Sequence, residues 1–168
     1  ELVSHLETLG ALPRAGVVAD IGVGTGLSAE PFLAAGHRVI GVEPNAPMRA
    51  AGVEYLARFS TYEARDGTAE ATGLEPGSVD LVIAGQAFHW FDHDKALPEI
   101  ARVLRPGGHL ALVWNQRDER IPWVRRLGRI IGTQEQLRDP AEVLVASKLF
   151  GFVDQKSFKT WQDVNRAT

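Results

Sequence analysis

The stretch that decides the fold is VVADIGVGTG, residues 17–26. Residues 16–21 form a short apolar run, which is typical of a buried parallel strand. Gly22, Gly24 and Gly26 then recur at every second position. Glycine loses more backbone entropy on folding than any other residue. A loop with three of them indicates a backbone that must turn tightly or let another group approach closely.

Strands and helices alternate on both sides of this loop. The predicted strands cover residues 16–21, 37–43, 61–65, 79–85, 109–115 and, less clearly, 152–158. The predicted helices cover residues 2–9, 28–35, 44–59, 93–104 and one or two segments of 120–137. This alternation predicts an α/β fold, with a doubly wound, mostly parallel, Rossmann-like sheet and helices on both faces.

Length and composition exclude several classes of protein. The 168 residues predict one domain, residues 1–168, and the net charge of −3 gives no basic field for nucleic acid. The chain has no cysteine, which excludes disulfides, thiolate metal sites and a cysteine nucleophile, and we predict no metal site. No apolar run approaches the ~20 residues of a membrane span. We therefore expect a cytoplasmic protein without membrane or nucleic-acid partners.

Informative residues lie at, or just after, the carboxyl end of each of the first five predicted strands. In chain order they are Asp20, Glu43, Thr68 with Ala69, Gly85 with Gln86, and Trp114 with Asn115. In an open parallel sheet, ligands bind outside the carboxyl ends of the strands. Glu43 lies about 20 residues past the glycines, where a carboxylate can accept both hydroxyls of a ribose. The alternative is a solvated carboxylate at a strand end.

The glycine spacing separates two kinds of nucleotide ligand. The dinucleotide fingerprint is G-x-G-x-x-G, whereas here the third glycine comes one position early and position 27 is Leu. Asp20 also places a carboxylate beside the loop, which disfavours a pyrophosphate and favours a ligand that carries an ammonium and a sulfonium. A Tyr-x-x-x-Lys pair is missing after Tyr55 and Tyr62 as well.

Five ordered motifs resemble a known family. VVADIGVGTG, VIGVEP, DGTAE, SVDLVIAGQAFHWFD and ARVLRPGGHLAL occur in the order and spacing of class I S-adenosylmethionine-dependent methyltransferases, closest to the small-molecule, type 11-like branch. The resemblance covers roughly residues 17–113. It implies S-adenosylmethionine as cofactor, S-adenosylhomocysteine as product and a small-molecule acceptor.

The resemblance also implies roles for individual residues. Asp20 would hold the amino group of the cofactor, directly or through water, and a helix that begins near Ser28 would face its carboxylate. Glu43 would bind the ribose, and Ala46 or Met48 would pack against the adenine. The other implied contacts are the glycine loop (Gly22, Gly24, Gly26) and Gly85 with Gln86 for the methionyl part, and Thr68 with Ala69 for the adenine edge.

His89 is the candidate catalytic base, because histidine titrates near neutral pH and follows the fourth strand. The alternative is that His89 packs structurally, as expected for His93 and Asp92 at the start of the next helix. Trp114 and Asn115 either line the acceptor pocket or, for Trp114, belong to the core. The arginines of residues 117–129 are interpreted as the solvated face of a helix.

The chain departs from the family pattern at both ends. The resemblance implies a helical segment ahead of residue 1 and a seventh strand, and we expect both to be absent from these 168 residues, so that the C-terminal hairpin is incomplete. An unpaired sheet edge favours pairing with another chain, and a homodimer is a hypothesis. Two alternative functions remain: an NAD-dependent oxidoreductase, and a non-catalytic cofactor-binding domain of methyltransferase fold.

Overall fold

The computed structural model describes residues 1–116, 118–131 and 139–159. Within these residues, five parallel strands form one sheet in the order β3-β2-β1-β4-β5. The strands are β1 (Val17–Ile21), β2 (Arg38–Val42), β3 (Tyr62–Arg65), β4 (Val79–Gly85) and β5 (Leu104–Val113). The chain winds outward from β1 in both directions, so the order reverses between β1 and β4. The predicted doubly wound sheet is confirmed.

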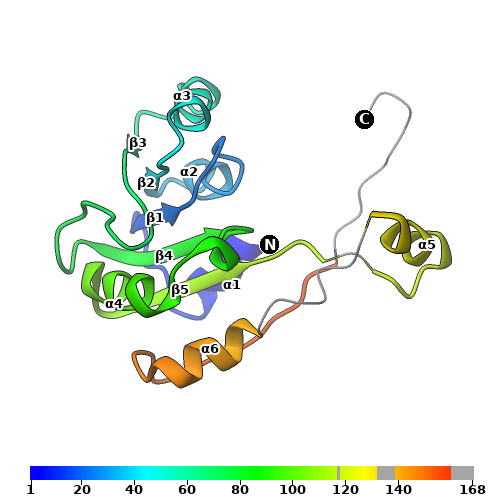
Figure 1. Cartoon of the computed structure of the whole chain (residues 1–168). Helices are drawn as coiled ribbons and strands as arrows, with labels where there is room; N and C mark the ends of the chain where they lie inside the picture. Colours follow the sequence, from blue (N-terminus) through cyan, green and yellow to red (C-terminus); the bar gives the residue numbers. More distant parts are fainter. Residues whose placement is uncertain (117, 132–138, 160–168) are drawn as a thin grey trace.

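Helices cover both faces of the sheet (Figure 1). The elements next to the sheet are α1 (Leu2–Thr8), α2 (Glu30–Ala34), α3 (Ala46–Tyr55), the 3₁₀ turn η1 (Phe88–Trp90), α4 (His93–Val103) and α6 (Pro140–Ser147), and one further helix, α5 (Pro122–Ile131), lies away from it (Figure 1). Successive strand residues point to opposite faces. Val18 therefore belongs to the same core cluster as Leu6 of α1 and Phe32 of α2, whereas its neighbour Ala19 belongs to the cluster on the other face, with Ile100 of α4 and Leu144 of α6.

The strand register brings the carboxyl ends of β1, β2 and β4 together. Asp20 of β1 lies opposite Gly41 of β2 on one side and opposite Ile83 of β4 on the other. The strands are parallel, so the residues that follow β1, β2 and β4 emerge at the same edge of the sheet. The glycine loop, Glu43 and Gly85 are thus gathered at one place although they span more than sixty residues of sequence.

Two sequence predictions are wrong. Residues 149–159 form no strand, and Phe152 is largely exposed, so the expected sixth strand around 152–158 does not exist. In the described part of the chain nothing pairs with the outer edge of β5, and a strand without a partner cannot form its hydrogen bonds. The second helix begins at Glu30 and not at Ser28, because residues 26–29 continue the loop as turns.

Smaller differences occur at the helices. The first helix was predicted to extend to Leu9, but α1 ends at Thr8 and Leu9 is exposed. Residues 132–137 of the helical segment predicted for 120–137 lie outside the described residues. Its first part, α5, is a helix with exposed arginines, as predicted, and it lies apart from the sheet (Figure 1). No helix within the described ranges is long and apolar enough to cross a bilayer.

Candidate functional site

The glycine loop needs glycine for two different reasons. Gly22, Gly24 and Gly26 all have positive φ, at +71°, +58° and +93°, a region that other residues rarely adopt. A Cβ on Gly22 would lie 2.7 Å from the Cβ of Ala87, and one on Gly26 would lie 2.7 Å from Leu56 Cδ1. The outer glycines are therefore required by packing inside the protein. Gly24 would meet just the flexible end of a methionine, Met48, at 3.1 Å.

Glu43 holds the middle of this loop. Its Oε2 accepts the amide hydrogen of Gly24 at 2.9 Å, and its Oε1 accepts that of Asn45 at 2.9 Å. Arg49 of α3 donates to the backbone carbonyl of Glu43 at 2.6 Å. Glu43 is buried, so the alternative of a solvated strand-end carboxylate is wrong. The residue is a fixed link between the end of β2 and the loop after β1.

Asp20 is the second buried carboxylate at this edge, with no exposed surface. Its Oδ2 accepts the hydroxyl hydrogen of Ser28 at 2.6 Å, while Oδ1 has no hydrogen-bond partner among the described residues. Burial penalises the charged form and raises the pKa of Asp20 from 3.8 to about 7, and the Ser28 hydrogen bond opposes part of that rise. This carboxyl group changes its charge near neutral pH.

Ser28 and Arg49 are site residues that sequence reasoning did not identify. Besides its bond to Asp20, the Ser28 side chain lies against Gly85, where an added Cβ would be 3.1 Å from Ser28 Cβ. Ser28 thus joins the ends of β1 and β4. The available signal was a hydroxyl residue two positions after the last glycine of the loop, which was interpreted as the beginning of a helix.

The end of β3 lies beside that of β2. Thr68 and Ala71 form an isolated antiparallel bridge, with Thr68 N to Ala71 O at 3.2 Å, which fixes a tight turn. Thr68 is exposed and Ala69 is buried. Asp66 is paired with Arg49 at 3.1 Å, so α3 connects this turn to Glu43. The structure brings Thr68 and Ala69 to the same edge as Glu43, and their contacts with an adenine stay predictions.

The end of β4 carries an unusual backbone conformation. Gln86 is exposed and has a φ of +57°, and its amide donates to the carbonyl of Val113 at 2.9 Å. A left-handed conformation at a residue other than glycine costs on the order of 1–3 kcal/mol and is enriched at functional sites. Ala87 follows, and its Cβ lies so near Gly22 that a Cβ on Gly22 would be 2.7 Å from it. The β4 loop and the glycine loop are therefore packed against each other.

The two histidines after β4 differ. His89 is half-buried, its Nδ1 is enclosed without a hydrogen-bond partner in the described residues, and its ring leans on that of exposed Trp90 at 4.9 Å. His93 stacks on Phe88 at 4.3 Å, and its Nε2 lies 3.0 Å from the Phe88 carbonyl oxygen. His93 is structural, as interpreted. Of the two ring nitrogens of His89, Nδ1 alone is among the enclosed atoms without a partner in the described residues.

Two residues next to these histidines refine the sequence interpretation. Asp92 occupies the N-cap position of α4, but its carboxylate accepts from Lys95 Nζ at 2.7 Å and makes no capping hydrogen bond. Trp114 packs against the core and meets Phe88 edge-on at 6.2 Å, whereas Asn115 is exposed. Trp114 is half-buried, and this packing favours the core alternative for it.

A family model described as Methyltransferase domain matches residues 19–112. The chain belongs to the methyltransferase domain family. The match begins within β1 and ends within β5, so it contains the glycine loop, Glu43 and the loop after β4. The predicted family is confirmed.

Relatives of this methyltransferase domain are longer proteins. An uncharacterised methyltransferase of Mycobacterium tuberculosis is 48% identical over 119 residues, which are 68% of this chain and 46% of that protein. An uncharacterised methyltransferase-like protein of Schizosaccharomyces pombe is 40% identical over 119 residues, which are 69% and 44% of the two chains. The domain thus spans somewhat less than half the length of these curated relatives.

Solved structures support the fold of the methyltransferase domain. The YcgJ protein of Bacillus subtilis superposes with a TM-score of 0.65 at 26% identity, over 86% of this chain and 66% of that one. Geranyl diphosphate C-methyltransferase of Streptomyces coelicolor, in complex with S-adenosyl-L-homocysteine, gives a TM-score of 0.64 at 20% identity, over 88% and 55%. The second likeness concerns the fold alone.

Proposed function

We propose that this methyltransferase domain transfers a methyl group from S-adenosylmethionine to a small-molecule acceptor. The observation that carries the proposal is the pair of buried carboxylates, Asp20 and Glu43, at the ends of adjacent strands around one glycine loop. The low dielectric constant of the protein interior strengthens the negative electrostatic potential of these two carboxylates. S-adenosylmethionine carries a sulfonium and an ammonium, which this potential attracts, whereas the pyrophosphate of NAD is repelled.

The carboxylate oxygens of Glu43 and Asp20 suit the polar groups of such a cofactor. Each carboxylate oxygen of Glu43 accepts one backbone amide and has a second lone pair, so both remain able to accept a ribose hydroxyl. Asp20 has no exposed surface, so it acts on a bound ammonium through its charge and through Ser28 or a bridging water. Its unpartnered Oδ1 supports this role, since buried carboxylate oxygens normally have a partner.

The remaining residues are assigned by their place at this edge. Met48 is partly exposed beside Gly24, which suits packing against an adenine. Thr68 and Ala69 border the same ligand at the end of β3. Gly85 and Gln86 follow β4 next to Ser28 and support the methionyl part. Gly22 and Gly26 shape the loop from within the protein.

Bound S-adenosylmethionine supplies an electrophilic methyl group whose transfer leaves a neutral thioether. The protein has to hold the acceptor in line and keep water away, because correct positioning alone lowers such a barrier by several kcal/mol. His89 is proposed to accept the proton that the acceptor loses. Its Nδ1 is enclosed, so that proton goes to Nε2. The exposed ring of Trp90 next to it offers the acceptor an apolar surface.

A small-molecule acceptor agrees with the sequence after β4. Residues 85–88 read GQAF, whereas enzymes that methylate the exocyclic amines of bases resemble one another in an N/D-P-P-Y/F stretch there. Methylation at C5 of a base needs a cysteine, and the chain has none. The proposal names a class of methyl acceptor, a small molecule, and no particular compound.

Titration calorimetry tests the donor. We expect the protein to bind S-adenosylhomocysteine and not NAD. Glu43→Gln should weaken binding at least about tenfold, since it removes a charge and one acceptor oxygen. Glu63→Gln is the matched control, because Glu63 is a strand carboxylate paired with Arg38 and Arg65. Binding of NAD without S-adenosylhomocysteine would overturn the proposal.

Methyl release tests catalysis separately. The protein is incubated with S-adenosylmethionine and a panel of small acceptors, and the amount of S-adenosylhomocysteine is measured. Turnover on at least one acceptor is expected, and His89→Gln should lower it at neutral pH by about 100-fold or more if His89 is the base. Tight binding without turnover on any acceptor would favour the non-catalytic domain.

A further inference from the structure

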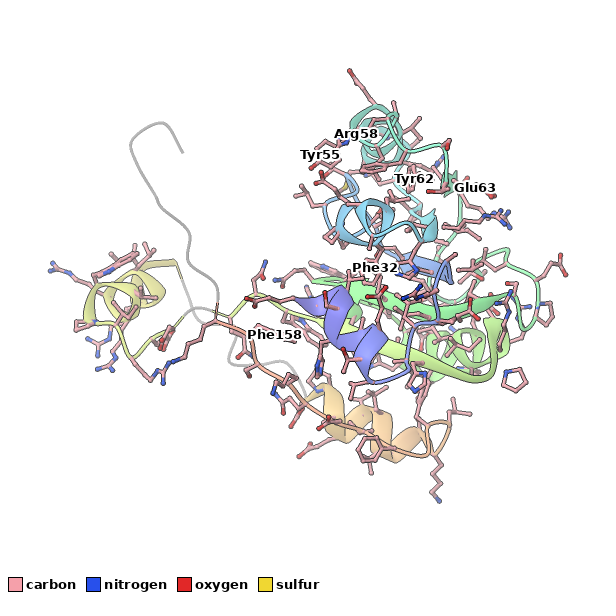
Figure 2. All side chains as sticks on the ribbon, turned by 180° about the vertical axis from the view of Figure 1, so that it is seen from behind. Phe32, Tyr55, Arg58, Tyr62, Glu63 and Phe158 are labelled. Carbon is pink, nitrogen blue, oxygen red and sulfur yellow. The ribbon has the colours of Figure 1, made fainter. Side chains whose placement is uncertain are left out.

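Tyr62 of β3 has a buried hydroxyl without a hydrogen-bond partner among the described residues. Its ring reaches over β2, because a Cβ on Gly41 would lie 2.6 Å from the Tyr62 hydroxyl oxygen. On the other side, a Cβ on Gly52 of α3 would lie 3.5 Å from the same atom. Figure 2 labels Tyr62 between α3 and the sheet. Two glycines therefore leave room for one phenol between β2 and α3.

The strand register places this hydroxyl beside Asp20. Val39 lies opposite Tyr62, and Gly41, two residues further on the same face of β2, lies opposite Asp20. Tyr62 leans along β2 from Val39 to Gly41, so its hydroxyl ends next to the position that borders Asp20. Burial is the main cause of a raised pKa of Tyr62, and the charges of Asp20 and then Glu43 add to it, in agreement with this placement.

Two buried atoms that have no hydrogen-bond partner among the described residues thus lie on one face of the sheet, on β3 and on β1 with β2 between them: the Tyr62 hydroxyl and Asp20 Oδ1. The other groups around Asp20 are the Ser28 hydroxyl, which already donates to Oδ2, the carboxylate of Glu43 at the end of β2, and apolar Ile83 on β4. None of these donates to Oδ1. Buried water that joins such groups is a regular part of protein interiors.

We propose that Tyr62 is a positioning residue for Asp20, whose Oδ1 it supplies with a hydrogen bond through one buried water molecule. A donor favours the ionised form of a carboxyl group. Tyr62 therefore shifts Asp20 toward the charged form that attracts the cationic end of a ligand. This last consequence rests on the proposed function, whereas the link between Tyr62 and Asp20 does not.

Tyr62→Phe tests the link in the ligand-free protein. The substitution removes one oxygen atom and keeps the ring. We expect the titration midpoint of Asp20, followed by the carbon chemical shift of its carboxyl group, to rise by about half a pH unit or more. Tyr55→Phe is the control, since Tyr55 donates to Glu30 on the outside of α3 and lies beside Arg58 (Figure 2). Tyr55→Phe should leave the titration midpoint of Asp20 unchanged.

A merely structural hydroxyl gives the opposite result. Removing a buried hydroxyl without a partner leaves stability equal or higher. An unchanged Asp20 midpoint together with unchanged or increased stability would overturn the proposal. A double-mutant cycle of Tyr62→Phe and Asp20→Asn gives a second measurement: the loss of stability caused by Tyr62→Phe should shrink in the Asp20→Asn background, and equal losses in both backgrounds would contradict the link.

The binding measurement keeps the two proposals apart. If S-adenosylhomocysteine binds, its affinity in Tyr62→Phe should reach its maximum at a higher pH than in the wild type, by the same shift as the Asp20 midpoint. If S-adenosylhomocysteine does not bind, the proposed function fails, while the shift in the ligand-free protein still supports the role of Tyr62.

Discussion

The Oε2 atom of Glu43 lies 2.9 Å from the amide nitrogen of Gly24, so the end of β2 holds the loop that follows β1. The other oxygen of the carboxylate holds the amide of Asn45, which caps α3. One buried side chain thus fixes the glycine loop and the beginning of α3 relative to each other. Both segments border the proposed cofactor site.

Glu43→Gln should destabilise the protein even without ligand. Both oxygens of Glu43 accept backbone amides, and glutamine has a single acceptor oxygen. One amide then faces an NH₂ group, which costs about 1–3 kcal/mol. Urea unfolding measures this loss. Glu63 pairs with the side chains of Arg38 and Arg65 at the surface, so Glu63→Gln should lower the free energy of unfolding by about 1 kcal/mol or less.

Asp20→Asn should change how stability depends on pH. The folded protein keeps a proton on Asp20 up to about pH 7, whereas an ordinary aspartate loses it near 3.8. Stability from this proton is present at low pH and is lost as the pH rises through that interval, by a few kcal/mol in total, at about 1.4 kcal/mol per pH unit. Asparagine does not ionise and keeps an acceptor for Ser28.

The measurement is the difference in unfolding free energy between Asp20→Asn and the wild type. This difference should increase in favour of the variant from pH 5 to pH 8. Binding of S-adenosylhomocysteine should weaken in the same variant. A difference that is constant over this interval would show that Asp20 does not titrate within it.

Gly22→Ala should destabilise the protein more than Gly10→Ala. Both glycines have nearly the same φ, +71° and +73°, so both substitutions carry the cost of a left-handed alanine, about 1 kcal/mol. The new Cβ at Gly22 would also lie 2.7 Å from Ala87, whereas nothing lies within 4 Å at Gly10. We expect an extra loss of about 1–3 kcal/mol, measured by thermal or urea unfolding.

Cofactor affinity separates the two variants further. Gly22→Ala should push the glycine loop away from the β4 loop and weaken binding of S-adenosylhomocysteine, while Gly10→Ala should leave it unchanged. Equal stability losses in both variants would contradict the close contact between Gly22 and Ala87.

Glu99→Gln should destabilise the protein in a pH-dependent way. Glu99 accepts the backbone amide and the hydroxyl of Thr72 at 3.0 and 2.6 Å and pairs with Arg102, which lowers the pKa of Glu99 to about 2. Its contribution is therefore present at neutral pH and is lost as the pH falls from about 4.5 to 2. We expect a loss of about 1–3 kcal/mol at pH 7.

Unfolding at pH 7 and at pH 3 checks this prediction, and the difference between wild type and variant should become smaller at pH 3. Binding of S-adenosylhomocysteine at pH 7 should be unaffected, since Glu99 anchors the loop before β4 to α4 outside the site. A variant that is as stable as the wild type at pH 7 would contradict the prediction.

Several structural features were predictable because their causes lie close together in the sequence. The predicted bounds of β4, residues 79–85, match the structure, since a short apolar run between turn residues is a local pattern. Asp20 and Glu43 were singled out because each lies at the carboxyl end of such a run. The glycine spacing likewise indicated a loop that turns tightly or lets another group approach, and all three glycines have positive φ.

The sequence did not reveal which groups those residues contact. Ser28 was interpreted as a helix position, but its hydroxyl is bound to Asp20. The strand expected around 152–158 failed because strand formation depends on a partner edge, which a local pattern does not contain. Tyr62 gave no signal, because the two glycines that make room for it are 21 and 10 residues away in the chain.

The sequence by itself determined the doubly wound sheet, the family and the set of acidic and glycine residues at the strand ends, because these depend on periodicity and spacing along the chain. The tertiary structure alone decided that Glu43 accepts hydrogen bonds from the amides of Gly24 and Asn45, and that Ala87 leaves no room for a Cβ at Gly22. It also decided that Asp20 is fully buried, with one oxygen that has no partner among the described residues. Those facts depend on how distant segments pack, and packing fixes both the space and the charge that a ligand meets.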